Sequence, residues 1–148
     1  MNDLLTRQAE WVELFNSLPS WQEKFQFLID TGEPLRTSAE QFCVEAHRID
    51  TCASRTYFSA SVVDERVRVR GSSNAAVPSG IIAVFIKLFD GTPVAELQDA
   101  ADAGAVNFHV ATGLLDNLTE TRRLSVIEMH RRLLAVSRHR EECSDVAI

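Results

Sequence analysis

Cysteine and basic charge are both scarce in this 148-residue sequence, which has three cysteines and fewer basic than acidic side chains. Three cysteines are too few and too sparse for a disulfide framework, so the count favours a reducing compartment and leaves at least one free thiol. The 15 lysines and arginines against 21 aspartates and glutamates give a net charge of -6. Nucleic acid is therefore not an expected partner, because phosphate binding needs a concentrated basic surface.

Long hydrophobic runs are also missing. The longest apolar run, residues 81–86, is far shorter than the ~20 residues that a membrane-spanning helix needs. Asp3, Glu10 and Glu13 interrupt any apolar stretch near the N-terminus, unlike the core of a secretion signal. The sequence predicts a cytoplasmic protein without a membrane partner.

Helical periodicity is typical of the first part of the chain. Apolar residues recur at helical spacing over residues 4–15, and Ser20 is placed to cap a second helix that ends at Gly32. We expect residues 34–38 to form a loop and residues 39–46 a short helix. Trp11 and Trp21 lie on the apolar stripes and are expected in the core.

The middle of the chain changes to the periodicity of strands. Residues 56–62 are rich in β-branched and aromatic side chains, and residues 66–70 alternate strictly between arginine and valine. Asp64 and Glu65 between these runs predict a turn, and Gly71 is the expected end of the second strand. The pattern predicts a β-hairpin whose valines face inward and whose arginines face outward.

Helices are expected again after the hairpin. The sequence predicts an apolar helix over residues 79–89 and a following helix capped by Thr92. Short helices are expected around Phe108 and Leu114. A last helix, capped by Thr119, is predicted from Glu120 to about Arg138. Together the elements predict an α+β fold with a small antiparallel sheet packed with several helices. We assign one domain to residues 1–138 and a polar, frayed tail to residues 139–148.

Cys52 stands in a polar segment directly before the first predicted strand. A thiol attacks only as thiolate, so it needs nearby positive charge and access to its substrate. Arg48 and Arg55 lie four residues before and three residues after it. Their side chains can lower the pKa of the thiol if they turn toward it. The competing interpretation is a small buried cysteine of the core.

Other side chains allow weaker hypotheses. A zinc site could use Cys43, His47 and Cys52 with Cys143 or His139, but the close ligand pairs of structural zinc are absent. His109 has no nucleophile beside it and is better explained as a core or surface residue. The pair Arg131 and Arg132, with Arg138 and Arg140, is explained by favourable charge at a helix C-terminus, with a docking role as the alternative.

Several segments, taken in order, resemble the SufE-like sulfur acceptors of iron–sulfur cluster assembly. The resemblance covers about residues 15–136 and rests on these positions: Phe15, Leu18, residues 21–25, Leu28, Ile29, Gly32, residues 48–54, residues 71–75, Gly80, Ile81, residues 91–97, residues 113–115, Leu118 and Arg122. Each motif is weak alone, but their shared order is specific. The resemblance implies a SufE-like fold in which Cys52 is the functional thiol.

The resemblance also implies a mechanism and partners. A PLP-dependent cysteine desulfurase forms an enzyme persulfide, and Cys52 takes its outer sulfur and carries it to an iron–sulfur scaffold or another acceptor. The PLP belongs to the desulfurase, and no cofactor or metal is expected on this chain. The implied supporting residues are Arg48, Thr51, Ser54, Arg55 and Arg122. The rival hypothesis is a module of the same fold that docks a desulfurase without carrying sulfur.

Some residues depart from the family pattern. Thr51 replaces the glycine that usually precedes the cysteine, and a β-branched residue adopts positive φ poorly. Asn74 replaces the usual aspartate, Ser79 stands where arginine is usual, and residues 123–125 replace a Ser-Asn-Gly stretch. These changes indicate a divergent member with a stiffer or differently posed cysteine loop.

Overall fold

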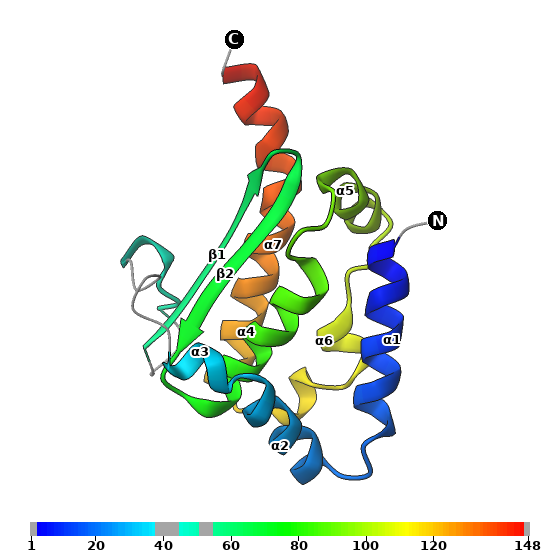
Figure 1. The fold of residues 1–148 in the computed structure, drawn as a ribbon, viewed down its shortest axis with the longest axis vertical. Helices are drawn as coiled ribbons and strands as arrows, with labels where there is room; N and C mark the ends of the chain where they lie inside the picture. The colour runs from blue at the N-terminus through cyan, green and yellow to red at the C-terminus, as the bar shows by residue number, and fades with distance from the viewer. Residues whose placement is uncertain (1–2, 38–44, 51–54, 147–148) are drawn as a thin grey trace.

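The computed structural model describes residues 3–37, 45–50 and 55–146, which form helices around one β-hairpin (Figure 1). The elements in chain order are α1 (Asp3–Ser17), α2 (Trp21–Thr31), α3 (Glu33–Thr37), η2 (Glu45–His47), β1 (Thr56–Val63), β2 (Arg66–Ser73), α4 (Ala76–Phe89), α5 (Val94–Asp102), α6 (Phe108–Ala111), η3 (Leu115–Asn117) and α7 (Glu120–Val146). This order confirms the predicted α+β class.

The hairpin forms where the sequence predicted it. Asp64 and Glu65 both have positive φ, 53° and 67°, which matches the twist of the flanking strands in a two-residue turn. Val67 and Val69 are buried, whereas Arg66 and Arg68 are exposed. The predicted end at Gly71 was wrong, because β2 continues to Ser73, which pairs with Thr56.

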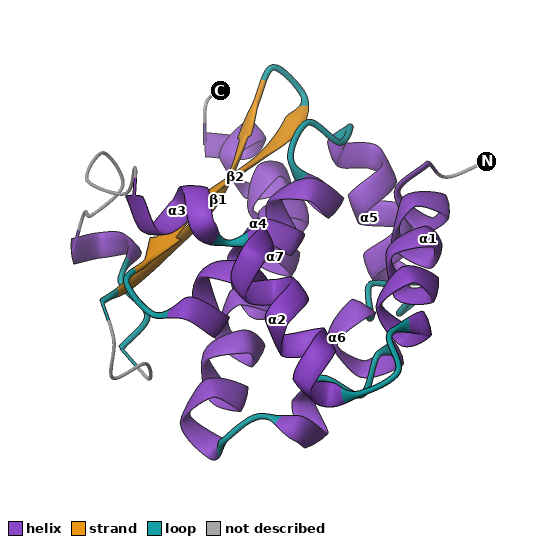
Figure 2. Cartoon of the chain, turned by 60° about the horizontal axis from the view of Figure 1, so that its bottom comes forward, coloured by secondary structure: helices purple, strands orange, loops and turns teal. Residues whose placement is uncertain are grey.

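The long helices α4 and α7 lie between the hairpin on one side and α1 and α6 on the other (Figures 1 and 2). Helix α4 packs against β2, and α7 packs against β1. Most of α4 is buried because it has neighbours on nearly every side. The core therefore runs between the hairpin and the N-terminal helices, with α4 at its centre.

Helices α2 and α4 cross with their backbones in close contact. A Cβ added at Gly80 would lie 2.0 Å from the carbonyl oxygen of Leu28, and one added at Gly32 would lie 2.3 Å from the Gly80 nitrogen. Gly32 ends α2 as predicted, but its φ is -85°, which any residue adopts. Its glycine is required by the approach of α4 and not by a left-handed turn.

Three predicted boundaries in the helical parts were wrong. Residues 33–37 form helix α3 instead of the expected loop. Pro34 fits in the first turn of this helix, because a backbone N–H there has no partner within the helix and its absence costs nothing. Helix α4 begins at Ala76, three residues early, with Pro78 in its first turn. Thr92 does not cap α5, because the helix begins at Val94 and Pro93 occupies the N-cap position. The Thr92 hydroxyl accepts a hydrogen bond from Arg7 instead.

Helix α7 is longer than the sequence predicted. It continues to Val146 and projects beyond the hairpin (Figure 1), so the expected end near Arg138 was wrong. The cap was correct, since the backbone N–H of Arg122 donates to the Thr119 hydroxyl at 3.5 Å. The predicted inner face, Val126, Met129, Leu133 and Val136, is buried.

Ser20 caps α2 as predicted by accepting a hydrogen bond from the Glu23 backbone N–H. Trp11 and Trp21 pack against the core and are partly buried. Of the short helix expected at residues 39–46, residues 39–44 lie outside the described residues. Among the helices that the structure describes, none combines the length and the apolar character needed to cross a membrane.

Candidate functional site at the base of the Cys52 segment

Residues 50–55, here called the Cys52 segment, begin and end at paired backbone positions. The Ile49 backbone N–H donates to the Thr56 carbonyl at 2.8 Å, and Arg48 forms a β-bridge with Tyr57. Ile49 and Thr56 are both fully buried. We call Arg48, Ile49, Thr56 and Tyr57 the base of the segment. Thr51, Cys52 and Ser54 lie outside the described residues, so their predicted roles stay predictions.

Asn74 fixes the end of the segment that leads into β1. Its side-chain oxygen Oδ1 accepts from the Arg55 backbone N–H at 3.1 Å, and its own backbone N–H donates to the Arg55 carbonyl at 3.2 Å. The next pair is joined by side chains, because the hydroxyls of Thr56 and Ser73 lie 2.8 Å apart. An amide oxygen thus serves as the acceptor at this end of the segment.

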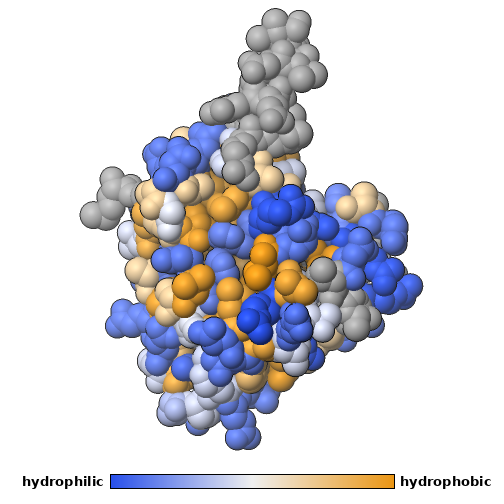
Figure 3. Space-filling view, turned by 180° about the vertical axis from the view of Figure 1, so that it is seen from behind, coloured by the Kyte–Doolittle hydropathy of each residue, from blue (hydrophilic) through white to orange (hydrophobic). Residues whose placement is uncertain are grey.

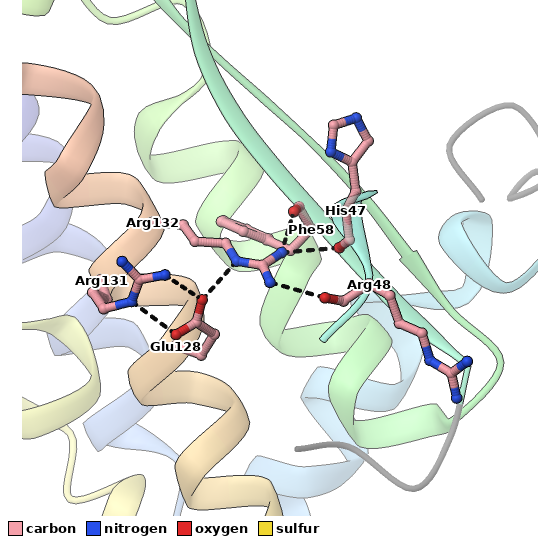
Figure 4. Close-up of polar contacts among 6 residues, drawn as sticks. All are labelled: His47, Arg48, Phe58, Glu128, Arg131 and Arg132. Carbon is pink, nitrogen blue, oxygen red and sulfur yellow. Dashed lines mark hydrogen bonds and ion pairs between the residues drawn. The ribbon is translucent and has the colours of Figure 1, made fainter. Parts of the chain in front are cut away.

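Arg132 of α7 holds the other end of the segment. Its Nη1 donates to the carbonyls of His47 and Phe58, both at 2.9 Å, and its Nη2 donates to the Arg48 carbonyl at 2.8 Å. Figure 4 shows the guanidinium reaching from α7 to these carbonyls. The side chain is 24% exposed. One largely buried cation therefore connects the longest helix to the chain on both sides of the base.

Glu128 orients this arginine. It accepts two hydrogen bonds from Arg131, at 2.8 and 2.7 Å, and one from the Nε of Arg132 at 2.7 Å (Figure 4). Hydrogen bonds from Arg131 and Arg132 lower the pKa of Glu128 to about 2. The carboxylate is therefore charged at neutral pH, and it fixes the plane of the Arg132 guanidinium.

The sequence did not predict the role of Arg132. It placed Arg131 and Arg132 at the end of the last helix, but α7 continues to Val146, so both lie near its middle. The spacing of Glu128 four residues before Arg132 indicates a helical ion pair. No sequence signal indicates the three carbonyls, because these come from segments more than 70 residues away.

The predicted supporting residues lie in different places. Arg48 belongs to the base, and Arg55 is the last residue of the Cys52 segment. The Arg48 side chain points away from Arg132 (Figure 4), and its Nη1 lies 3.8 Å from a Glu45 carboxylate oxygen. Arg122 is exposed in the first turn of α7, where its guanidinium makes no hydrogen bond or ion pair with residues that the structure describes.

His109 is a core residue, as the simpler interpretation predicted. It is 7% exposed, and its ring lies 4.3 Å from the ring of His130. Burial and the nearby His130 lower the pKa of His109 to about 4. Of the zinc ligands considered, only His47 has a described side chain. Within residues 3–37, 45–50 and 55–137, no cluster of three or more metal-binding side chains occurs.

The outer face of α7 carries apolar side chains among charged ones. Leu124 and Ile127, three residues apart on α7, are 46% and 44% exposed, and the Arg131 side chain is 62% exposed. Figure 3, which shows the molecule from behind, has small apolar patches separated by hydrophilic side chains. A face of this composition is compatible with protein contacts but does not by itself specify a partner.

Comparison with known proteins identifies the family. A sequence model described as SufE, Fe-S metabolism associated domain, matches residues 9–136. The chain belongs to the SufE family. The match includes the base of the Cys52 segment, Asn74 and the Glu128–Arg132 pair, so the geometry described above lies within the SufE domain.

The relatives found in the comparison are distant in sequence. The chain is 27% identical over 114 residues to an uncharacterized SufE-like protein of Synechocystis, covering 77% of this chain and 69% of that protein. It is 27% identical over 85 residues to the sulfur acceptor protein CsdE of Escherichia coli, covering 57% and 58%. A solution structure of a hypothetical protein from Thermus thermophilus has a TM-score of 0.68 at 20% identity, covering 90% and 94%. The fold is thus that of a divergent SufE member.

Proposed function

We propose that this SufE-family protein is a sulfur acceptor that receives a persulfide sulfur from a PLP-dependent cysteine desulfurase on Cys52. The observation that carries the proposal is the position of Cys52. It stands in the family-like segment 48–54, within a domain that matches the SufE model over residues 9–136. The names of two relatives support the same chemistry, a sulfur acceptor protein in Escherichia coli and a cysteine desulfuration protein in Wigglesworthia.

The transfer is a thiolate–persulfide exchange. The Cys52 thiolate attacks the outer sulfur of the desulfurase persulfide, a new S–S bond forms on Cys52, and the old S–S bond breaks. The electron pair of the broken bond leaves with the desulfurase thiolate, so the exchange needs no external oxidant or reductant. The persulfide on Cys52 then passes its outer sulfur to an iron–sulfur scaffold or another acceptor by the same exchange.

The described residues support this chemistry through the base of the segment. Cys52 lies three positions after Ile49 and four positions before Thr56 in the sequence. A thiol tethered between two hydrogen-bonded ends loses less freedom when it meets a second sulfur than a thiol on a free tail. Arg48 and Arg55 lie within four residues of Cys52 in the sequence, and their charges would favour the thiolate over the thiol if the side chains turn toward it.

We place this activity in the cytoplasm, with the PLP on the desulfurase and no cofactor on this chain. The low number of cysteines fits a reducing compartment. The exposed apolar residues Leu124 and Ile127 on α7 are a candidate part of the desulfurase contact.

Desulfurase assays with cysteine variants test the proposal. Candidate desulfurases are assayed for alanine release from cysteine with wild-type protein, Cys52→Ser, and the matched controls Cys43→Ser and Cys143→Ser. We expect wild type and both controls to stimulate turnover and Cys52→Ser to lose the stimulation. Equal stimulation by Cys52→Ser contradicts the sulfur-acceptor proposal and supports a docking module.

A further inference from the structure

Arg132 joins α7 to the chain on both sides of the Cys52 segment. On the entering side it binds the carbonyls of His47 and Arg48, and on the leaving side it binds the carbonyl of Phe58 in β1 (Figure 4). With the bond from Nε to Glu128, all three guanidinium nitrogens are engaged.

The carbonyls of His47 and Arg48 lie at the end of a short helix. His47 is the last residue of the short helix η2 and Arg48 comes directly after it, so no continuing turn binds their carbonyls. Ile49 comes directly after them and is fully buried, so the chain enters the Cys52 segment from a buried position. A charged donor here fixes the direction in which the chain enters the segment.

We propose that Arg132, oriented by Glu128, is a positioning residue for Cys52: it locks the base of the segment to α7 and thereby restrains the thiol. This inference rests on the proposed function of Cys52 but concerns a residue that does not touch the reacting sulfur. Lysine cannot replace the arginine fully, because an ammonium is a point charge without the planar fork that reaches three carbonyls and a carboxylate together.

The test uses the full chain in a Cys43→Ser, Cys143→Ser background, so that Cys52 is the one thiol that reacts. Arg132→Gln and Arg132→Lys are compared with Arg131→Gln. Arg131 is the matched control, since it lies on the same helix and binds the same carboxylate but does not contact the base. Two quantities are measured on the free protein: amide hydrogen exchange at Ile49 and the rate of Cys52 alkylation by iodoacetamide.

We expect Arg132→Gln to speed Ile49 exchange about tenfold and Cys52 alkylation about fivefold, because the base is released from α7. Arg132→Lys should give rates between those of the parent and Arg132→Gln. Because lysine keeps the positive charge, Arg132→Lys is the variant to compare with the parent if Arg132→Gln folds poorly. Arg131→Gln should stay within about twofold of the parent in both measurements.

A role confined to stability would speed Ile49 exchange but leave alkylation of the folded protein unchanged, and that result overturns the inference. An equal effect of Arg131→Gln, or a slower alkylation in Arg132→Gln, overturns it as well. Neither measurement requires a desulfurase, so the outcome is independent of whether Cys52 accepts sulfur. Failure of the parent protein to accept sulfur would instead contradict the proposed function.

Discussion

At the scale of single residues, two side chains bind the backbone where the chain enters and leaves the Cys52 segment. Asn74 binds the backbone of Arg55 at one end, and Arg132 binds the carbonyls of His47 and Arg48 at the other. The replacement of the usual aspartate by Asn74 keeps a side-chain oxygen as acceptor while removing a charge. The amide of Asn74 can therefore hold the backbone of Arg55 without the charge of a carboxylate.

Thr51 gives a prediction at this scale. If the segment needs positive φ at residue 51 when it opens, the β-branched side chain costs on the order of 1–2 kcal/mol. Thr51→Gly should then speed alkylation of Cys52 in the free protein by roughly five- to thirtyfold. The control is Thr56→Ser, which keeps the hydroxyl bonded to Ser73. An alkylation rate equal to that of wild type would show that Thr51 imposes no strain.

At the scale of elements, the close crossing of α2 and α4 forms one corner of the core. The crossing depends on two glycines, since a side chain at either position would meet backbone atoms of the other helix. α4 in turn packs against β2, so the crossing also supports the hairpin.

We therefore expect Gly80→Ala to lower the free energy of unfolding by about 3 kcal/mol, because its Cβ would lie 2.0 Å from the Leu28 carbonyl oxygen. Gly104→Ala is the control. It has open space around the new Cβ but a φ of +66°, so we expect a loss of about 1 kcal/mol. Urea denaturation measures both. A loss for Gly80→Ala no larger than that for Gly104→Ala would contradict the packing account.

Periodicity predicted the elements well because each pattern reflects one buried face. The alternation of Val67 and Val69 located β2, and the apolar spacing from Val126 to Val136 located α7. Contacts between distant segments could not be predicted in this way. Gly32 signalled a helix end, but its need for glycine comes from the approach of Gly80. Arg132 also signalled a helix end, but it binds the carbonyls of His47, Arg48 and Phe58.

At the scale of the whole molecule, α7 connects the parts that the site needs. It packs against β1 and α5, and it carries both the Glu128–Arg132 pair and the His130 ring beside His109. His130 also binds the Val106 carbonyl at 2.9 Å, so the same helix holds the segment that leads into α6. Changes that loosen α7 should therefore affect the Cys52 base and the α6 side together.

The buried His109 predicts a dependence of stability on pH. Its pKa is about 4 in the folded protein, against about 6.5 in the unfolded chain. Between these two pKa values the unfolded state binds more protons than the folded state. The contribution of His109 to the free energy of unfolding is therefore fully present above about pH 6.5 and is lost as the pH falls toward 4. We expect a loss of about 2 kcal/mol between about pH 7 and pH 5 from this group.

His109→Gln isolates that contribution, because the other titrating groups remain. The difference in unfolding free energy between wild type and the variant, from urea denaturation, should shrink by about 2 kcal/mol as the pH falls from about 7 to 5. A difference that stays constant over this range would show that His109 takes up its proton equally in the folded and unfolded protein.

The central claim is that Cys52 is the thiol on which the protein receives sulfur. The most direct measurement incubates the protein with candidate desulfurases, PLP and cysteine, followed by intact-mass analysis and peptide mapping without reductant. We expect one added sulfur atom on wild type, Cys43→Ser and Cys143→Ser, located on Cys52, and none on Cys52→Ser. Sulfur added to Cys52→Ser in the same amount, or located on another cysteine of the wild type, would contradict it.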